Sequence, residues 1–204
     1  MIALEKALAC ADYVVAIIPE TVLLSSFPKQ RMELAVVIQD SLFGDTEAPA
    51  LVACFTQDSC TDARIFTGNQ SIGALSEILA LRDSSAPKQK IVFNEPTGRI
   101  GLRAVDGSDG QSPIAFVAAA DFSYPKDSVV VSSRLMTYVE IPNLSDDQIS
   151  SLIPNANEVF SEIRKASGDL VLAPFKGNDK NGKRRRRLDY TLARRILNQA
   201  AIGL

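Results

Sequence analysis

Two short apolar runs near the N-terminus constrain the fold most. They are Tyr13–Ile18 (YVVAII) and Ala50–Phe55 (ALVACF). Each has the length and the β-branched content of a buried strand, and each meets a turn-forming or polar break at one end. Pro19 and Glu20 follow the first run, and the segment 44–49 (GDTEAP) precedes the second. The N-terminal part of the chain is therefore predicted to contain strands of a buried sheet.

Residues 1–68 alternate in the rhythm of an α/β sheet: helix, strand, helix, strand, strand. The predicted elements cover residues 4–11, 13–18, 25–33, 34–40 and 50–57. The last two strands are joined by a short Gly, Asp and Pro loop, so we expect them to be antiparallel neighbours.

Residues 69–85 are predicted to be a connecting helix, because Ile72, Leu75 and Ile78 recur at helical spacing. From Lys88 to Ile141 the pattern changes to short strands separated by tight-turn residues. These strands are predicted at 90–96, 98–107, 112–122, 128–134 and 135–142. This part of the chain is expected to be a small β-rich unit.

The C-terminal part is predicted to contain three helices and a strand. Ser145 lies three residues before Gln148, which is the spacing of a capping box and marks the start of a short helix. Residues 155–166 form a second helix, 170–175 a strand and 188–202 an amphipathic helix, with Leu188, Leu192, Ile196 and Ala200 on one face.

Several classes of protein are excluded by what the 204 residues lack. No run of eighteen apolar residues occurs, and the N-terminus has no basic start or small-residue cleavage site, so we expect no membrane span and a cytoplasmic location. The chain has no histidine, which excludes a His-dependent triad and a His zinc site. Its three cysteines have no metal-like spacing and are interpreted as buried or incidental thiols.

The charge is distributed unevenly along the chain. Residues 176–204 contain nine lysines and arginines against two aspartates, whereas the other 175 residues hold 13 basic and 22 acidic groups. A basic region of this kind is typical of a nucleic-acid contact, because neutralised phosphates release their condensed counterions. A solvated tail or a subunit contact would have the same composition.

The order of the N-terminal motifs resembles a known family. YVVAIIPETVLL (Tyr13–Leu24) followed by DSLFGDTEAPALVACF (Asp40–Phe55) is similar to the late catalytic motifs of the gamma-class adenine-specific DNA methyltransferases of restriction-modification systems. In that family a strand ending in Ile/Val-Ile/Val-Pro leads through a helix and a strand to a loop carrying Phe, and then to a strand ending in an aromatic residue.

The resemblance implies an α/β fold, formed by the C-terminal part of a methyltransferase-like (Rossmann-like) sheet with a reversed final hairpin, followed by a smaller β-rich α+β lobe. It implies three regions: a partial α/β domain at 1–68, a connecting helix at 69–85, and a target-recognition-like lobe at 86–204 with the basic segment.

Two motifs of the family do not occur in these 204 residues. They are the glycine loop that holds S-adenosylmethionine and the Asn/Asp-Pro-Pro-Tyr/Phe tetrapeptide that orients the adenine amine. We therefore interpret the chain as a split, truncated or excised C-terminal portion, inactive alone and without a cofactor of its own. A partner chain with the cofactor-binding half, or self-association, is expected to complete it.

The family match also implies substrate-binding residues. Phe43 corresponds to the aromatic residue that stacks on the flipped adenine, and Pro19 with Glu20 falls beside the active-site cleft at the end of a strand. Phe43 packing under its own turn, and Glu20 capping a helix or facing solvent, are the alternatives. No catalytic or metal-binding residue is assigned.

Double-stranded DNA is the predicted partner of the basic residues. Lys183, Arg184, Arg185, Arg186 and Arg187 are expected to contact phosphates from a loop or the first turn of a helix, and a nuclear localisation signal is the weaker interpretation. Arg99, Arg103 and Arg134 are candidates for reading guanine edges, although each alone could be a surface charge.

Two functions from different classes therefore compete. The first is a subunit or fragment of an adenine-specific DNA methyltransferase that supplies part of the catalytic sheet, adenine stacking and target recognition. The second is a non-catalytic DNA-binding or anti-restriction module. A protein without a DNA ligand, whose basic tail binds another subunit, is a third interpretation.

Overall fold

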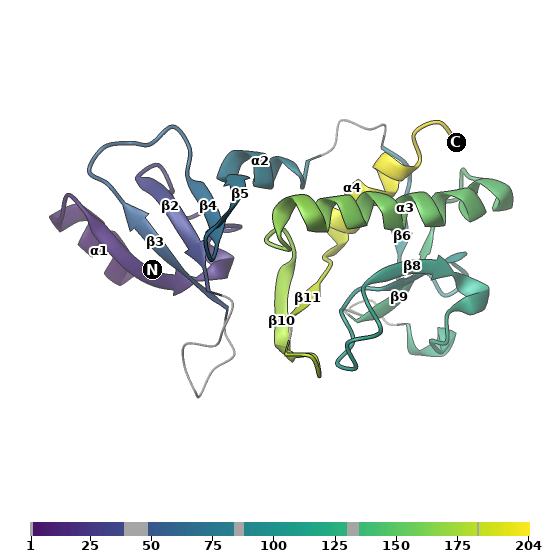
Figure 1. The fold of residues 1–204 in the computed structure, drawn as a ribbon. Helices are drawn as coiled ribbons and strands as arrows, with labels where there is room; N and C mark the ends of the chain where they lie inside the picture. The colour runs from purple at the N-terminus through teal and green to yellow at the C-terminus, as the bar shows by residue number, and fades with distance from the viewer. Residues whose placement is uncertain (1, 39–48, 84–87, 130–134, 183) are drawn as a thin grey trace. The chain divides into compact units, whose positions relative to one another are not determined.

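The computed structural model describes residues 2–38, 49–83, 88–129, 135–182 and 184–204 (Figure 1). The chain divides into two compact units. Unit 1 comprises Met1–Leu81 with Ala166–Val171, and unit 2 comprises Arg82–Lys165 with Leu172–Leu204. Within unit 1, the short second segment approaches the first closely, since a Cβ atom on Gly168 would lie 3.2 Å from Ile72 Cδ1.

Unit 1 is a five-stranded sheet with two short helices. Its elements are α1 (Ile2–Cys10), β1 (Val14–Pro19), the 3-10 helix η1 (Glu20–Val22), β2 (Met32–Val37), β3 (Ala50–Phe55), β4 (Arg64–Thr67), β5 (Gln70–Ala74) and α2 (Leu75–Ala80). The strand order is β1-β3-β2-β4-β5. Strand β3 is antiparallel to both β1 and β2, so these two run in the same direction. The predicted antiparallel pairing of 34–40 with 50–57 is confirmed.

The two faces of this sheet differ in burial. Leu51, Ala53 and Phe55 of β3 face a closed core and are at most 2% exposed. On the opposite face, Val15 and Ile17 of β1 are 71% and 56% exposed. Strand β1 is also an edge strand, because it pairs with β3 and with no other strand among the described residues. An apolar edge strand without a charged side chain is a template for pairing with another chain.

Arg31 attaches α1 to the sheet. Its guanidinium donates hydrogen bonds to the carbonyl oxygens of Leu8, Ala11 and Asp12 at the C-terminal end of α1. Its Nε atom donates to the carbonyl of Thr56, directly after β3. A cation at the C-terminal end of a helix stabilises the orphan carbonyl groups there.

Two predicted helices of unit 1 are wrong in part or in full. Residues 25–33 form turns instead of a helix, and Met32 and Glu33 already belong to β2. Pro28 cannot donate in a helix interior, and the Ser25 hydroxyl accepts a hydrogen bond from the Phe27 amide in a local turn. In 69–85, only Leu75–Ala80 is helical, because Gln70–Ala74 pairs with β4 as a hairpin strand.

Unit 2 contains a four-stranded antiparallel sheet, two helices and a separate hairpin. Its elements are β6 (Val92–Phe93), β7 (Ile100–Arg103), β8 (Ala115–Ala118), the 3-10 helices η2 (Ala119–Asp121) and η3 (Lys126–Ser128), β9 (Met136–Glu140), α3 (Asp146–Ser167), β10 (Ala173–Asn178), β11 (Arg184–Arg187) and α4 (Tyr190–Ala200). The sheet order is β6-β9-β7-β8, and β10 pairs only with β11 within the named strands. The predicted strand 128–134 lies largely outside the described residues.

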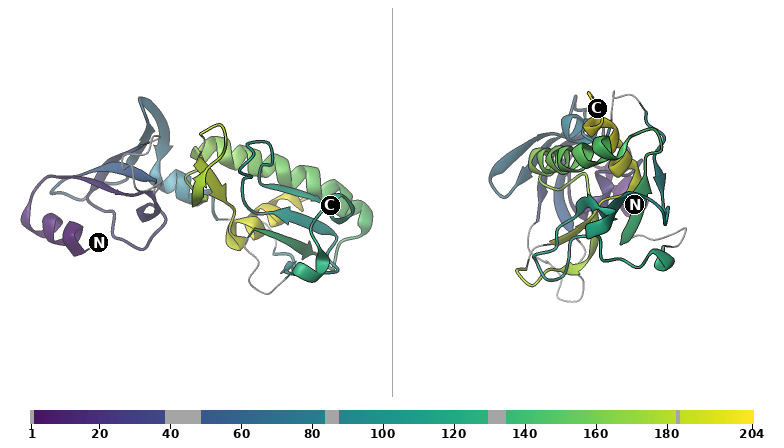
Figure 2. Two further views of the ribbon diagram at one scale, coloured as in Figure 1. Left: turned by 90° about the horizontal axis from the view of Figure 1, so that it is seen from below. Right: turned by 90° about the vertical axis from the view of Figure 1, so that its right-hand side faces the viewer.

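Helix residues cover both edges of the four-stranded sheet. At β8, the Asn157 side chain of α3 accepts from the Phe116 amide at 3.0 Å and donates to the Phe116 carbonyl at 2.8 Å. At the other edge, Arg194 of α4 donates to the Ile91 carbonyl, and Tyr190 stacks on Phe93 with ring centroids 4.4 Å apart. Figures 1 and 2 both show α3 running along this unit. Unlike β1 of unit 1, these edges are protected.

Helix α3 replaces the two helices predicted at 145 and 155–166. The capping box is confirmed, because Ser145 Oγ accepts from the Gln148 amide and Gln148 Oε1 accepts from the Ser145 amide. The helix continues through Pro154. Its buried residues before and after the proline, among them Leu152 and Ala156, lie on one stripe, so burial outweighs the cost of about 3 kcal/mol for an interior proline.

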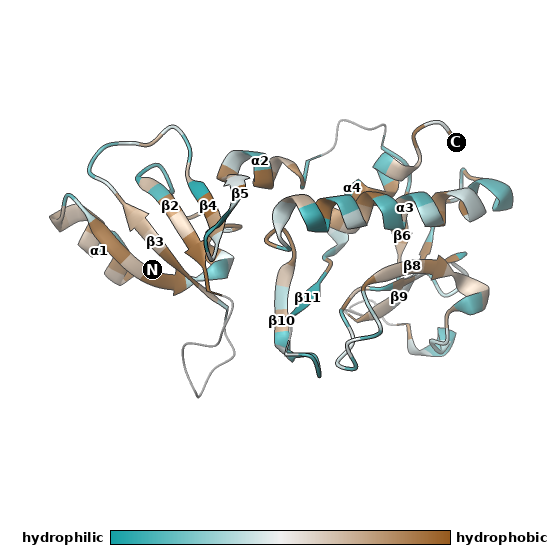
Figure 3. Ribbon diagram, in the orientation of Figure 1, coloured by the Kyte–Doolittle hydropathy of each residue, from teal (hydrophilic) through white to brown (hydrophobic). Residues whose placement is uncertain are grey.

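The basic block is a strand, which corrects its prediction as a loop or a first helical turn. Arg184–Arg187 is β11, and it appears hydrophilic along its length in Figure 3. Successive side chains of a strand point to opposite faces, so adjacent arginines are separated from one another. The partner strand β10 begins at Ala173, three residues after the predicted start at Leu170.

Helix α4 confirms the predicted amphipathic C-terminal helix. Asp189 caps it, with its side chain accepting a hydrogen bond from the Leu192 amide at 2.9 Å. In the part of the chain that is described, no helix combines the length and the apolar character needed to cross a lipid bilayer. The three cysteines are free thiols, and none of them is fully buried.

Candidate functional site

Basic side chains from distant parts of unit 2 gather around the turn 106–112. Two hollows flank this turn, of about 310 Å³ and 330 Å³. Arg164 and Arg184 line the first, Arg103 lines the second, and Arg185 lines both. These arginines come from α3, β11 and the end of β7, so the fold brings them together from four sequence positions. We call this region the basic turn site.

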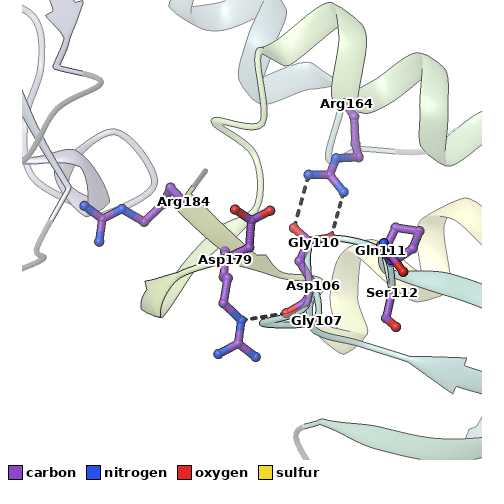
Figure 4. Close-up of a pocket in the computed structure, with 10 residues that line it drawn as sticks. Asp106, Gly107, Gly110, Gln111, Ser112, Arg164, Asp179 and Arg184 are labelled. Carbon is purple, nitrogen blue, oxygen red and sulfur yellow. Dashed lines mark hydrogen bonds and ion pairs between the residues drawn. The ribbon is translucent and has the colours of Figure 1, made fainter. Parts of the chain in front are cut away.

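Asp106 is the centre of the site. Its carboxylate accepts from Arg164 Nη1 at 3.0 Å and Nη2 at 3.2 Å, as Figure 4 shows. The same carboxylate accepts the backbone amides of Ile114 and Arg186, both at 3.1 Å. Asp106 therefore fixes α3, the 106–114 loop and β11 at one point, through charge-assisted bonds that are stronger than neutral ones.

The base of the β10–β11 hairpin is held against the segment 104–106. The Asp106 amide donates to the Arg186 carbonyl at 3.1 Å, and the Leu188 amide donates to the Ala104 carbonyl at 2.8 Å. A β-bridge joins Val105 to Arg187. These contacts make β11 a rigid support for the side chains that it carries.

Asp109 closes the turn on itself. Its carboxylate accepts from the Ser112 hydroxyl at 2.6 Å and from the amides of Gln111 and Ser112 at 2.9 Å. The Ser112 hydroxyl and then these amides lower the pKa of Asp109 to about 2. The Asp109 carboxylate thus accepts its hydrogen bonds within the turn. No ion pair joins it to Arg103 or Arg185 among the described residues.

Arg185 is held in a defined orientation. Its guanidinium carbon lies 4.9 Å from the centroid of the Phe175 ring, and its Nε donates to the Asp106 carbonyl at 2.7 Å. Nη1 is 3.5 Å from the Lys176 carbonyl, which is a weak contact. A guanidinium stacked on a ring with its Nε anchored leaves its terminal nitrogens available to a planar acceptor.

The structure distributes the predicted DNA-binding arginines unevenly. Arg103, Arg184 and Arg185 all line the basic turn site, and Arg184 points away from the Arg164–Asp106 pair (Figure 4). Arg186 is only 7% exposed, and Arg187 lies in the bridge to Val105. Arg134 and Lys183 are outside the described residues.

Arg99 lies elsewhere and has a structural role. Its Nε and Nη2 donate to the Glu140 carboxylate, its Nη1 donates to Asp146 at 2.7 Å, and Nη2 also donates to the Ile141 carbonyl. These side-chain hydrogen bonds raise the pKa of Arg99 above its ordinary value. A base edge could be contacted only at the expense of these bonds.

Pro19 and Glu20 of unit 1 lie beside the residues that directly follow the segment carrying Phe43. Pro19 is the register partner of Ala50, and the Glu20 amide donates to the Pro49 carbonyl at 3.0 Å. On the other side, the Ile38 amide donates to the Ala50 carbonyl. Phe43 itself lies outside the described residues. Pro19 is exposed, whereas Glu20 is 3% exposed, so the alternative that Glu20 faces solvent is wrong.

A cofactor loop of the strand-glycine-helix type needs free amide groups at the start of its helix. In the described ranges, Gly73, near the end of β5, is the only glycine that stands just before a helix in this way. There the Ala74 amide donates to Glu77, and the Ser76 amide donates to Asp62. The described residues therefore do not fit an S-adenosylmethionine site of this type, and no step of methyl transfer is assigned to them.

Several residues of the basic turn site were not predicted. Asp106 and Arg164 carry no local motif, because the pair joins a turn to a helix 58 residues later. For Lys176 and Lys180, the excess of basic residues in 176–204 is the sequence signal that indicates a basic site.

Comparison of the chain with protein-family models, curated proteins and solved structures gives no match.

Proposed function

We propose that this chain is the C-terminal part of an adenine-specific DNA methyltransferase. In this proposal it contributes part of the catalytic sheet, the residue that stacks on the flipped adenine, and a DNA target-recognition lobe. The cofactor loop and the tetrapeptide that orients the amine would come from a preceding part of the protein or from a partner chain.

The main support is the arrangement at the end of β1. The sequence resemblance implies a reversed final hairpin, and β3 runs antiparallel between β1 and β2. Pro19 and Glu20 then fall next to Ala50 and Pro49, directly after the segment carrying Phe43, and Ile38, directly before it, contacts Ala50 from the other side of β3. A base extruded from a duplex needs an aromatic surface at such a strand end to compensate for lost stacking.

The basic turn site supports the second half of the proposal. Arg103, Arg184 and Arg185 supply guanidinium groups to the two hollows that flank the turn 106–112, and Lys176 and Lys180 are exposed on the hairpin that carries Arg184 and Arg185. Such a set can neutralise phosphates and donate to base edges. Arg99 is left out of the proposed interface because its donors bind Glu140, Asp146 and Ile141.

The test is reconstitution with a complementary chain. The chain is co-expressed with the product of the neighbouring upstream gene, and transfer of a tritiated methyl group from S-adenosylmethionine to duplex DNA is measured. We expect N6-methyladenine only when both chains are present, and a lower kcat for Phe43→Ala than for Phe43→Tyr.

The outcomes separate the competing functions. DNA binding by the pair without methyl transfer would favour the non-catalytic DNA-binding module. If the pair shows neither DNA binding nor methyl transfer, the basic turn site is better explained as a contact with another protein.

A further inference from the structure

The β10–β11 hairpin of unit 2 is a two-stranded ribbon with a fixed base and a polar end. Its base is bound to 104–106 through the Arg186 carbonyl, the Leu188 amide and the Val105–Arg187 bridge. It is not part of the four-stranded sheet. Toward the turn, the ribbon carries exposed Lys176, Asn178, Lys180 and Asn181. All four are hydrogen-bond donors, and two are cations.

The end of the ribbon is docked on the neighbouring turn. The Lys180 amide donates to the Ser108 carbonyl at 2.9 Å. Asn181 lies so close to Gly110 that a Cβ atom on Gly110 would overlap the side-chain amide nitrogen of Asn181. The Asp179 side chain accepts the Asn181 amide at 2.9 Å, which closes the hairpin turn. The backbone of the ribbon is thereby supported at both ends.

One arginine of the ribbon is prepared to donate to a planar acceptor. Arg185 is stacked on Phe175 and anchored to the Asp106 carbonyl, and it shares its hollow of about 330 Å³ with Arg103. Arg103 donates to the Pro113 carbonyl at 3.4 Å, a long contact that leaves most of its donors unused by the described residues. The forked geometry of a guanidinium matches the O6 and N7 acceptors of guanine.

The dimensions of the ribbon suit one groove of DNA. Paired strands lie about 4.8 Å apart, and the major groove of B-DNA is about 12 Å wide, so it admits a two-stranded ribbon with its side chains. The minor groove is about 6 Å wide, so a ribbon enters it only when the DNA is deformed.

We infer that the β10–β11 hairpin inserts into the major groove of double-stranded DNA as a β-ribbon, with Arg185 reading a guanine and Lys176 and Lys180 contacting phosphates. This inference rests on the proposed function only for the identity of the ligand. The β10–β11 hairpin is then the element that reads the DNA sequence, whereas Arg99 has a structural role.

The first experiment selects a binding sequence. The full chain is incubated with a pool of duplexes randomised at their centre, and the bound fraction is sequenced. We expect an enriched motif that contains guanine. The affinity is then measured for the selected duplex and for the same duplex with 7-deazaguanine, which lacks the N7 acceptor in the major groove and leaves the minor groove unchanged.

Loss of the N7 acceptor should weaken binding of the wild-type chain by about 5-fold, the lower end of the range for one bidentate contact, because O6 is still present. Arg185→Lys keeps the charge and loses the fork, so this variant should discriminate between the two duplexes less than the wild-type chain does. Lys180→Ala should instead weaken binding to every sequence and reduce the slope of log K against log salt by about 0.9. Lys90→Ala, an exposed lysine of the same unit, is the matched control and should change neither quantity.

The inference is overturned if 7-deazaguanine has no effect on the wild-type chain, if no motif is enriched, or if Lys180→Ala behaves like Lys90→Ala. The deazaguanine comparison uses the wild-type chain, so it stays decisive if Arg185→Lys does not fold. None of these measurements uses S-adenosylmethionine or a partner chain. A ribbon that reads guanine without methylation in the reconstituted pair would contradict the proposed function alone, and methylation without guanine reading would contradict the ribbon alone.

Discussion

Arg164 and Asp106 form a two-point ion pair in which each terminal nitrogen of the guanidinium meets one carboxylate oxygen, at 3.0 Å and 3.2 Å. The two side chains are 18% and 14% exposed. The pair is therefore screened only weakly, and its geometry links the longest helix of unit 2 to the turn that supports the β10–β11 hairpin.

Replacing Asp106 with alanine is expected to destabilise unit 2 strongly. The change removes the carboxylate that accepts both Arg164 hydrogen bonds in a mostly buried position, and it removes the acceptor of the Ile114 and Arg186 amides. Loss of one partner of such a pair costs about 3 kcal/mol of unfolding free energy. Urea unfolding followed by circular dichroism measures it. Asp127→Ala, at an exposed aspartate of the same unit, should stay within about 0.5 kcal/mol of the wild type. Equal effects of the two changes would contradict this role of Asp106.

The folded state should lose stability as the pH is lowered, because of Glu140. Burial alone would raise the pKa of Glu140, but the side-chain and backbone hydrogen bonds from Arg99 outweigh it and lower this pKa below the ordinary 4.5. A lowered carboxyl pKa stabilises the folded state at pH values above 4.5, and this contribution is lost as the pH falls through the folded-state pKa.

Arg99→Ala should remove that pH dependence. At pH 7 we expect its unfolding free energy to be about 2 kcal/mol below that of the wild type, because charge-assisted hydrogen bonds are lost. The difference should shrink as the pH is lowered from 4.5 through the lowered folded-state pKa of Glu140, where this carboxylate becomes protonated in the wild type. Urea midpoints at a series of pH values test this. A difference that stays constant from pH 7 to pH 3 would exclude Glu140 as the partner responsible.

The apolar edge of unit 1 should be covered in solution by a partner chain or a second copy. Val15 and Ile17 are exposed on β1, which has one free edge among the described residues. In sedimentation at micromolar concentration, we expect the chain alone to be larger than its monomer mass of 22.0 kDa. Val15→Lys should restore the monomer with little change in stability, and Ile202→Lys, at a residue 56% exposed in unit 2, should not. A soluble wild-type monomer would count against this expectation.

The chain alone is expected neither to bind S-adenosylmethionine nor to methylate DNA. The amides of Ala74 and Ser76 at the start of α2 are taken by Glu77 and Asp62, and the family's glycine loop does not occur in the 204 residues. Calorimetric titration with the cofactor should give no heat of specific binding. Micromolar affinity would show that the chain has a cofactor site of a different kind.

Local patterns in the sequence predicted several elements correctly. The apolar runs at 13–18 and 50–55 became β1 and β3, and the Gly, Asp and Pro loop between 40 and 50 correctly indicated an antiparallel pair. Ser145 with Gln148 predicted the start of α3. In each case the signal and its partner are close in sequence, so propensity and turn chemistry are sufficient.

Predictions failed where distant residues decide the local structure. Residues 70–74 have helical spacing, but pairing with β4 makes them a strand. The four consecutive arginines have no intrinsic preference for a strand, and they form one because the segment 104–106 and the partner strand β10 bind their backbone. The same reason applies to the basic turn site, since nothing near Asp106 in the sequence indicates Arg164 or Arg185.

The order of the chain through the two units has a consequence for recombination between related genes. Unit 1 is completed by Ala166–Val171, in which Leu170 and Val171 are at most 2% exposed. A single crossover between codons 81 and 82 would join a new unit 2 to an old sheet and also replace this buried segment. Exchange of an intact unit 2 requires breakpoints on both sides of 166–171 as well. The two units should therefore be inherited together more often than modules joined by one linker.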